Sequence, residues 1–212
     1  MYADFHIHTK YSKCSDIEPS LLVKVALQKK YNAIAIVDHD NIKGGFAVRK
    51  FAGKNLIVIP GEEKMTDRGE ILIFFSDGKY GTDLIEICER AKDMNHFVIA
   101  AHPFDFFRKS LGKNIASIKP DAIEVFNSRS LLGLMNGKAA DYAYNNSIPK
   151  IGGSDAHFIE EIGNVSVFLD CDNNEDSIIE AIRKEKLVID GKKGSLMPHI
   201  KTNILLPLRR II

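Results

Sequence analysis

The chain contains 212 residues, of which 45% are apolar and 27% charged, and its formal net charge is +1. This length suits one domain with a sizeable hydrophobic core, or one domain with a small appendage. A net charge near zero gives no overall field that would attract nucleic acid or an anionic membrane, which argues against a dedicated nucleic-acid-binding protein. A nucleotide substrate held by a few local charges is still allowed.

Cysteine usage and the N-terminal segment both favour a reducing, cytoplasmic setting. Cys14, Cys88 and Cys171 lie far apart and form no CxxC pair, so neither a disulfide framework nor a zinc ribbon is indicated. The N-terminus lacks the basic region and apolar stretch of a signal peptide. No apolar run reaches the roughly 18 residues needed to span a bilayer. We therefore expect a cytoplasmic protein without a membrane partner.

Short apolar segments alternate with amphipathic ones along the chain. Apolar runs predict strands at 2–7, 33–37, 56–59, 70–75, 97–101, 122–126, 150–152, 165–169 and 187–189. Helical periodicity predicts helices at 19–30, 44–52, 83–94, 132–144 and 174–184. This alternation predicts an α/β architecture with a mainly parallel sheet. We expect one domain over 1–194, and in 195–212 an apolar segment packed on that domain or at a subunit contact.

Histidines and carboxylates gather directly after the predicted strands. His6 and His8 are two residues apart at the end of the first strand, so their side chains point to the same side. The other clusters, each just after a strand, are Asp38 with His39, Glu62 with Glu63, His102 alone, and Asp155 with His157. Barrels and open α/β sheets place their active sites at the C-terminal ends of strands. The five clusters therefore predict one common centre.

Taken singly, most of these clusters have ordinary structural interpretations. Asp38 suits a helix N-cap, and Asp155 after two glycines and a serine suits a turn. Only the pair His6 and His8, taken alone, indicates a metal site as strongly as an ordinary structural role. Together the clusters favour a metal centre, and imidazole with carboxylate suits zinc, manganese or iron(II). More than four candidate ligands imply more than one ion, an arrangement suited to in-line displacement at phosphorus.

Five motifs resemble those of the PHP (polymerase and histidinol phosphatase) family. They are DFHIHTKYS at 4–12, AIVDHDNIKG at 35–44, PGEE at 60–63, AHPFD at 101–105 and GGSDAH at 152–157. The resemblance runs from about residue 2 to residue 189 and is greatest to small stand-alone PHP phosphoesterases. It implies a distorted seven-stranded, TIM-like β/α barrel with two or three divalent ions, Mn, Zn or Fe.

The resemblance also implies roles for individual residues. One ion would be held by His6, His8, Glu63 and Asp155, a second by Glu63 and His102, and a third by Asp16, His39 and His157. The second ion of the family often has another histidine, which is absent here between His102 and His157, so Asn127 is a candidate ligand or substrate contact. Arg108 and Arg129 lie in loops on the predicted active face, where a guanidinium would match phosphate oxygens.

These observations predict a metal-dependent phosphoesterase of the phosphatase or nucleotidase/exonuclease type. The expected substrate is a small phosphorylated metabolite, a nucleotide or a short oligonucleotide, attacked by a metal-activated water. His157 or Asp38 would carry a proton to the leaving oxygen. Two alternatives are a metal-dependent amidohydrolase and a PHP-like metal-binding module without turnover. The sequence leaves the oligomeric state open.

Overall fold

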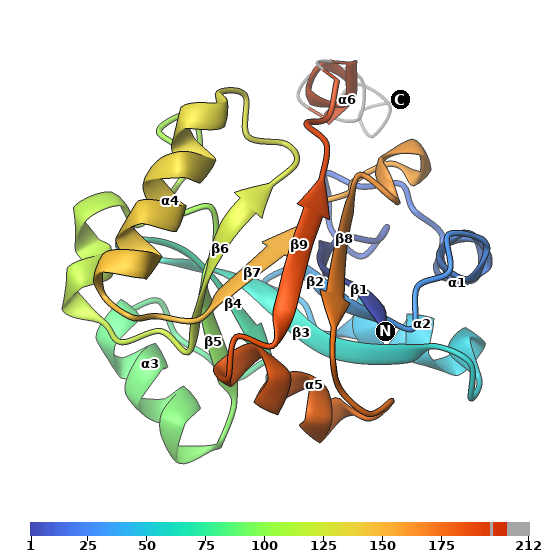
Figure 1. The fold of residues 1–212 in the computed structure, drawn as a ribbon, viewed down its shortest axis with the longest axis horizontal. Helices are drawn as coiled ribbons and strands as arrows, with labels where there is room; N and C mark the ends of the chain where they lie inside the picture. The colour runs from blue at the N-terminus through green and yellow to red at the C-terminus, as the bar shows by residue number, and fades with distance from the viewer. Residues whose placement is uncertain (196, 203–212) are drawn as a thin grey trace.

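One sheet forms the centre of the molecule. The computed structural model describes residues 1–195 and 197–202. In this part of the chain the strand order is β7-β6-β5-β4-β3-β2-β1-β8-β9 (Figure 1). The strands are β1 (Tyr2–Ile7), β2 (Ala33–His39), β3 (Ile57–Thr66), β4 (Gly69–Phe74), β5 (Phe97–Ala100), β6 (Ala122–Asn127), β7 (Lys150–Gly153), β8 (Val165–Leu169) and β9 (Leu187–Gly191).

Helices cover both sides of this sheet. They are α1 (Pro19–Gln28), α2 (Lys43–Ala52), α3 (Leu84–Asp93), α4 (Gly133–Asn145), α5 (Glu175–Arg183) and the short α6 (Met197–Ile200), with 3₁₀ turns η1 (Gly112–Ser117) and η2 (Ile159–Glu161). Sequence signals explain where several of them begin. Pro19 opens α1, where a missing N–H costs nothing, and the Asp83 carboxylate caps α3 by accepting from two backbone N–H groups. The Asn174 side-chain oxygen caps α5 by accepting from the Ser177 N–H.

The nine predicted strands and five predicted helices are confirmed, and all but one of their ends lie within two residues of the prediction. The exception is β3, which continues to Thr66 and joins β4 through the two-residue turn Asp67–Arg68. This turn reverses β4, so β4 runs antiparallel to both β3 and β5. Strands β8 and β9 are also antiparallel to their neighbours. The prediction of a mainly parallel sheet is therefore correct for only half of the neighbouring pairs.

The sheet curls into a nearly closed barrel. Ile7 at the end of β1 forms a parallel bridge with Ala156, just beyond β7, so the chain after the last strand of one edge reaches the middle of the sheet. The bond from Asp155 N–H to the His6 carbonyl, at 2.7 Å, strengthens this closure. Strands β8 and β9 extend the sheet on the other side of β1. The nearly closed barrel therefore has nine strands in the described residues, and the count of seven that the family resemblance implied is not confirmed.

Alternating side chains divide the core into an interior and two outer layers. On β4, Leu72 and Phe74 belong to the cluster inside the barrel, whereas Ile71 and Ile73 pack beneath α3 and α4. This follows from the two-residue period of a strand. Helix α5 adds further apolar side chains to the interior cluster, and α1 and α2 cover the opposite outer face. Figure 1 shows α3 and α4 on one side of the sheet and α1 and α2 on the other.

Two residues near the end of the described chain, Lys201 and Thr202, contact the loops that follow β7 and β6. The Lys201 ammonium forms an ion pair with Glu160, and Arg129 Nη2 donates to Thr202 Oγ1 at 3.0 Å. The apolar end of the chain, 204–212, on which part of the prediction for 195–212 depends, lies outside the described residues. Across residues 1–195 and 197–202, no helix is both long enough and apolar enough to cross a membrane.

Candidate metal centre

Strand β1 delivers two histidines to the same point at the rim of the barrel. The pairing register of β1 with β2 shifts between Asp4 and Ile7, and both His6 and His8 are fully buried. Their Nε2 atoms lie 3.1 Å apart. The sequence spacing predicted that the two imidazoles would face one site, and the structure places them in this way.

Two carboxylates complete a cage around these nitrogens. Glu63 Oε2 lies 3.5 Å from His6 Nε2 and 3.2 Å from His8 Nε2. Asp155 Oδ1 lies 3.5 Å and 3.3 Å from the same two atoms. Four ligands at about 2.0–2.1 Å from an ion, in a tetrahedron, have atoms about 3.3 Å from one another. The five distances from 3.1 to 3.5 Å therefore match five of the six edges of such a tetrahedron.

The same cage contains two of the five buried polar side-chain atoms that have no hydrogen-bond partner among the described residues. Glu63 Oε2 and Asp155 Oδ1 are buried and accept no hydrogen bond from the described residues. A buried carboxylate oxygen without a partner is costly, because it has lost its water and gained nothing in exchange. A divalent ion inside the cage would satisfy both oxygens at once. Two imidazole nitrogens and two carboxylate oxygens therefore fit zinc, manganese or iron(II).

Glu124 on β6 holds the ligands from behind. Its Oε1 atom lies 2.9 Å from His6 Nδ1, and its Oε2 atom accepts from the His102 N–H at 2.9 Å and from Asn127 Nδ2 at 3.0 Å. A carboxylate on the far nitrogen of a ligand histidine fixes the ring and its tautomer. A Cβ on Gly153 would lie only 2.3 Å from His6 Cβ, so the packing behind the centre requires glycine there.

Sequence reasoning missed Glu124 because it lies inside a strand and not after one. The available signal was a charged residue in the otherwise apolar segment AIEVF. Asn127, predicted as a ligand or substrate contact, donates from Nδ2 to Asp155 Oδ2 at 3.1 Å. Its Oδ1 atom accepts from the Arg129 N–H at 2.9 Å. Asn127 therefore orients Asp155 through its amide nitrogen.

Glu63 also faces a second position. Its Oε1 atom lies 2.9 Å from His102 Nε2, on the opposite side of the carboxylate from the cage. Both His102 and Asp155 have positive φ, at 29° and 55°, a conformation that non-glycine residues rarely adopt. Such strain is typical of functional sites, where the surrounding structure enforces it. Glu63 thus lies between the cage and His102, and the bridging role that the resemblance implied for it stays a prediction.

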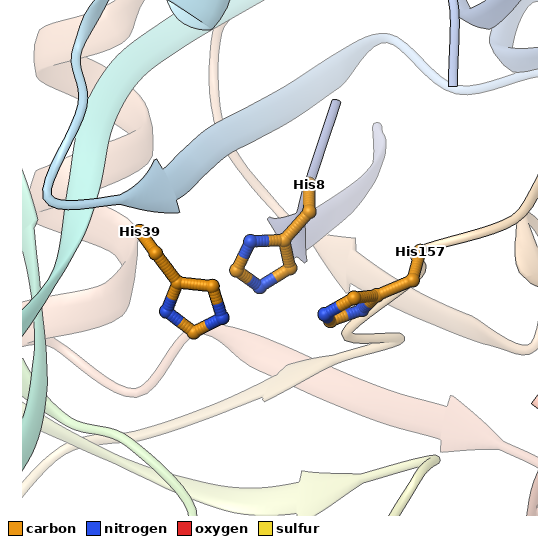
Figure 2. A group of neighbouring side chains, drawn as sticks. All are labelled: His8, His39 and His157. Carbon is orange, nitrogen blue, oxygen red and sulfur yellow. The ribbon is translucent and has the colours of Figure 1, made fainter. Parts of the chain in front are cut away.

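A third group consists of histidines alone. His8, His39 and His157 offer ring nitrogens that lie within 4.8 Å of one another. Figure 2 shows the three rings converging, with His8 between the other two, and the ring centres lie 4.7 Å and 4.2 Å from that of His8. Asp16, predicted to join this group, is exposed, and its backbone N–H donates to the His157 carbonyl at 3.3 Å. Its side chain belongs to none of the three ligand groups that the described residues form.

Burial and neighbouring charges set the protonation of these groups. Burial lowers the pKa of His6, but the carboxylates of Asp155, Glu124 and Glu63 outweigh burial and raise it well above its ordinary value. Burial, followed by the charge of His8, holds the pKa of His157 well below 6.5. Burial also lowers the pKa of His39 to about 4. His39 and His157 are therefore neutral near pH 7, the form that binds metal.

The remaining predicted residues have contacts of different kinds. The Arg108 guanidinium forms an ion pair with Asp155 Oδ2 at the centre itself. Asp38, predicted as a proton carrier, accepts from Thr9 N–H, Thr9 Oγ1 and Ser12 Oγ, each at 2.7 Å. Both of its oxygens therefore hold the loop after β1.

Arg129 is buried away from solvent and braces the loop that carries His157. Its Nη1 atom lies 3.3 Å from Glu161 Oε2, and that oxygen accepts from the N–H groups of His157 and Phe158 at 2.9 Å and 3.1 Å. The pair stays buried, with 5% of one side chain and 2% of the other exposed. The structure thus gives Arg129 an intramolecular partner in place of an open position for substrate.

A nearly closed barrel that collects histidines and carboxylates at one rim defines a class of α/β metal-site proteins. Within that class, the sequence profile of the PHP domain matches residues 4–113, and that of the PHP-associated region matches residues 133–187. The chain belongs to the PHP domain family.

Two relatives from Methanocaldococcus jannaschii support this membership. The uncharacterized protein MJ1587 is 36% identical over 152 residues, covering 66% of this chain and 89% of that protein. The uncharacterized protein MJ0417 is 35% identical over 177 residues, covering 79% of this chain and 70% of that protein. Their similarity covers about two thirds and about four fifths of this chain and supports the family without identifying a reaction.

Solved structures share the fold at low sequence identity. A "putative metal-dependent phosphoesterase" from Bifidobacterium adolescentis superposes with a TM-score of 0.62 at 16% identity, over 73% of this chain and 87% of that one. An amidohydrolase from Chromobacterium violaceum, crystallised with sulfate and without metal, gives 0.63 at 14% identity, over 88% and 97%. At these identities the likeness shows the fold alone.

Proposed function

We propose that this protein is a metal-dependent phosphoesterase. The observation that carries the proposal is the position of Glu63, with Oε2 in the four-atom cage and Oε1 at 2.9 Å from His102 Nε2. A carboxylate placed in this way can bridge two adjacent ions. Paired ions suit in-line displacement at phosphorus, because they neutralise the attacking and leaving oxygens together.

The chain's own residues contribute positioning, charge and proton transfer. Bound divalent ions would supply an activated water and stabilise developing negative charge. Arg108, beside Asp155, has the planar guanidinium that matches phosphoryl oxygens and would bind the substrate there. His157, neutral near pH 7, would first accept a proton from the attacking water and then pass it to the leaving oxygen. Asp38 would act indirectly, by holding the loop after His8.

The proposed substrates are a small phosphorylated metabolite, a nucleotide or a short oligonucleotide. Net charge near zero supports a small substrate over a long nucleic-acid strand, since no excess of basic residues is available to follow a phosphate backbone. The phosphoesterase name of the Bifidobacterium neighbour agrees with this reaction type. The amidohydrolase neighbour makes amide hydrolysis the second activity to assay. We propose a cytoplasmic location, as the cysteine usage suggested.

The test compares metal-stripped protein with protein reloaded with Mn²⁺, Zn²⁺ or Fe²⁺. Substrates are p-nitrophenyl phosphate, its bis-ester, and a panel of nucleoside phosphates and N-acyl amino acids. We expect phosphate release only after reloading, and a loss of at least about 100-fold in His8→Ala and Asp155→Ala, because each removes a ligand of the cage.

His96→Ala is the matched control, because His96 contacts Tyr80 and lies outside all three ligand groups. It should keep the wild-type rate. Equal turnover by stripped and reloaded protein, or preferential amide cleavage, would contradict the proposal.

A further inference from the structure

Two phenylalanines are exposed side by side in the loop between β5 and η1. Phe106 is 65% exposed and Phe107 is 58% exposed, and their ring centres lie 4.3 Å apart. Phenylalanine is among the residues most often buried, and exposed apolar side chains that cluster, unlike scattered ones, mark binding surfaces. Phe104 in the same loop is partly buried and packs against Tyr142 of α4, with the ring centres 5.4 Å apart. The loop thus buries one aromatic ring and leaves the next two open to solvent.

Asp105 holds this loop in place. Its backbone N–H donates to the His102 carbonyl at 3.0 Å, and its Oδ1 atom accepts from the Phe107 N–H at 3.1 Å. Its Oδ2 atom accepts from Ser130 Oγ at 3.0 Å, which ties the loop to the one that follows β6. The Arg108 N–H donates to the Asp105 carbonyl, also at 3.0 Å. Because the backbone beneath the two rings is already fixed, a ligand that stacks on them need not first order the loop.

The same loop brings positive charge to the metal centre. Arg108 directly follows Phe107, and its guanidinium forms an ion pair with Asp155 Oδ2 while 20% of its side chain stays exposed. The Cα atoms of consecutive residues are about 3.8 Å apart, so the ring and the guanidinium leave the backbone at neighbouring points. Lys109 comes next and is exposed. Aromatic rings beside cationic side chains are the combination that binds a flat ring and a phosphate within one ligand.

We infer that Phe106 and Phe107 form an aromatic platform that binds a flat ring of the substrate, such as a nucleobase, while Arg108 binds its phosphate. This inference rests on the proposed phosphoesterase function. It narrows the substrate from any small phosphoester to one that carries an aromatic ring. In a mononucleotide a single ribose separates the base from the phosphate, so both groups can reach neighbouring side chains. Stacking of one base on an aromatic side chain typically strengthens binding by about 5- to 150-fold.

The experiment measures the binding of two probes that cannot be hydrolysed, by calorimetric titration of protein reloaded with Mn²⁺. The probes are the phosphonate analogues of AMP and of ribose 5-phosphate, in which CH₂ replaces the bridging ester oxygen; only the first carries a base. Phe106→Ser with Phe107→Ser removes both rings, and Phe106→Tyr with Phe107→Tyr keeps them. Phe51→Ser is the matched control, because Phe51 on α2 is 57% exposed and lies outside this loop. Thermal unfolding establishes that each variant folds.

Wild type should bind the AMP analogue at least about fivefold more tightly than the ribose 5-phosphate analogue. The double serine variant should lose this preference and keep the wild-type affinity for the ribose 5-phosphate analogue. The double tyrosine variant and Phe51→Ser should keep the preference. Equal binding of both analogues by wild type, or an unchanged preference in the double serine variant, would overturn this inference and leave the phosphoesterase proposal standing. Failure of wild type to bind either analogue would overturn the inference together with the proposed phosphate site at Arg108.

Discussion

Replacing Glu124 by glutamine tests how strongly the residues behind the cage control metal binding. Three donors converge on this carboxylate, from His6 Nδ1 at 2.9 Å, the His102 N–H at 2.9 Å and Asn127 Nδ2 at 3.0 Å. Glutamine has one acceptor oxygen, which is best placed toward the His102 N–H and Asn127 Nδ2, because these two groups cannot become acceptors. Its NH₂ group then faces His6 and requires Nδ1 to be an acceptor.

That change would move the His6 proton to Nε2, the atom that points into the cage. A protonated Nε2 cannot bind an ion, so each metal-binding event must first restore the other tautomer. Losing such an outer partner typically costs 10–100-fold in metal affinity, or about 1.4–2.7 kcal/mol. We therefore expect Glu124→Gln to weaken Zn²⁺ and Mn²⁺ binding within this range.

Competition titration with a chromophoric chelator measures the affinity, and ¹⁵N NMR of the imidazoles reports the tautomer of His6. Glu62→Gln serves as the control, because Glu62 is buried on β3, where it accepts from Ser76 and does not contact His6. If Glu124→Gln binds metal as tightly as wild type, with His6 still protonated on Nδ1, the reasoning about its three donors is refuted.

Three further changes have expected outcomes away from catalysis. Arg129→Met should lower the free energy of unfolding in urea by about 3–5 kcal/mol, because it leaves Glu161 buried without its partner; an unchanged unfolding midpoint would contradict this. Gly153→Ala should cost about 1–3 kcal/mol in thermal unfolding of the stripped protein, since its Cβ would meet that of His6 at 2.3 Å, and a wild-type melting temperature would show that the packing can relax. His96→Gln should reduce the loss of stability between pH 7 and pH 5. Burial lowers the pKa of His96 below 6.5, so its contribution is complete above that pH and is lost as the pH falls; parallel pH profiles for variant and wild type would exclude this.

Local pattern located most of the fold. Apolar runs such as AIAIV at 33–37 are long enough to be strands and too short to be helices, so their positions were predictable from residue type alone. Asp67 and Arg68 show the limit of this reasoning. A two-residue turn carries little sequence signal, yet it reverses β4 and changes the character of the sheet. The nine-stranded count likewise depends on pairing between segments distant in sequence.

The same limit explains which site residues were found. His6, His8 and Asp155 come just after strands that end at the rim, so a rule about the ends of parallel strands located them. Glu124 lies within a strand, so that rule could not locate it.

The roles of the two loop residues needed the fold as well. Asp38 accepts hydrogen bonds from Thr9 and Ser12, and Arg129 donates hydrogen bonds to Glu161 and Thr202. These partners are distant in sequence, so no local pattern predicts these contacts. The sequence could place such residues near the centre but could not say which way they face.

The claim on which everything else depends is that the four-atom cage holds a divalent ion. Anomalous diffraction from crystals grown with Mn²⁺ tests it most directly. We predict an anomalous peak about 2.0–2.2 Å from His6 Nε2, His8 Nε2, Glu63 Oε2 and Asp155 Oδ1. A map without a peak at this position would contradict the account. In that case only Arg108 and the histidines would pair with the Asp155 and Glu63 carboxylates.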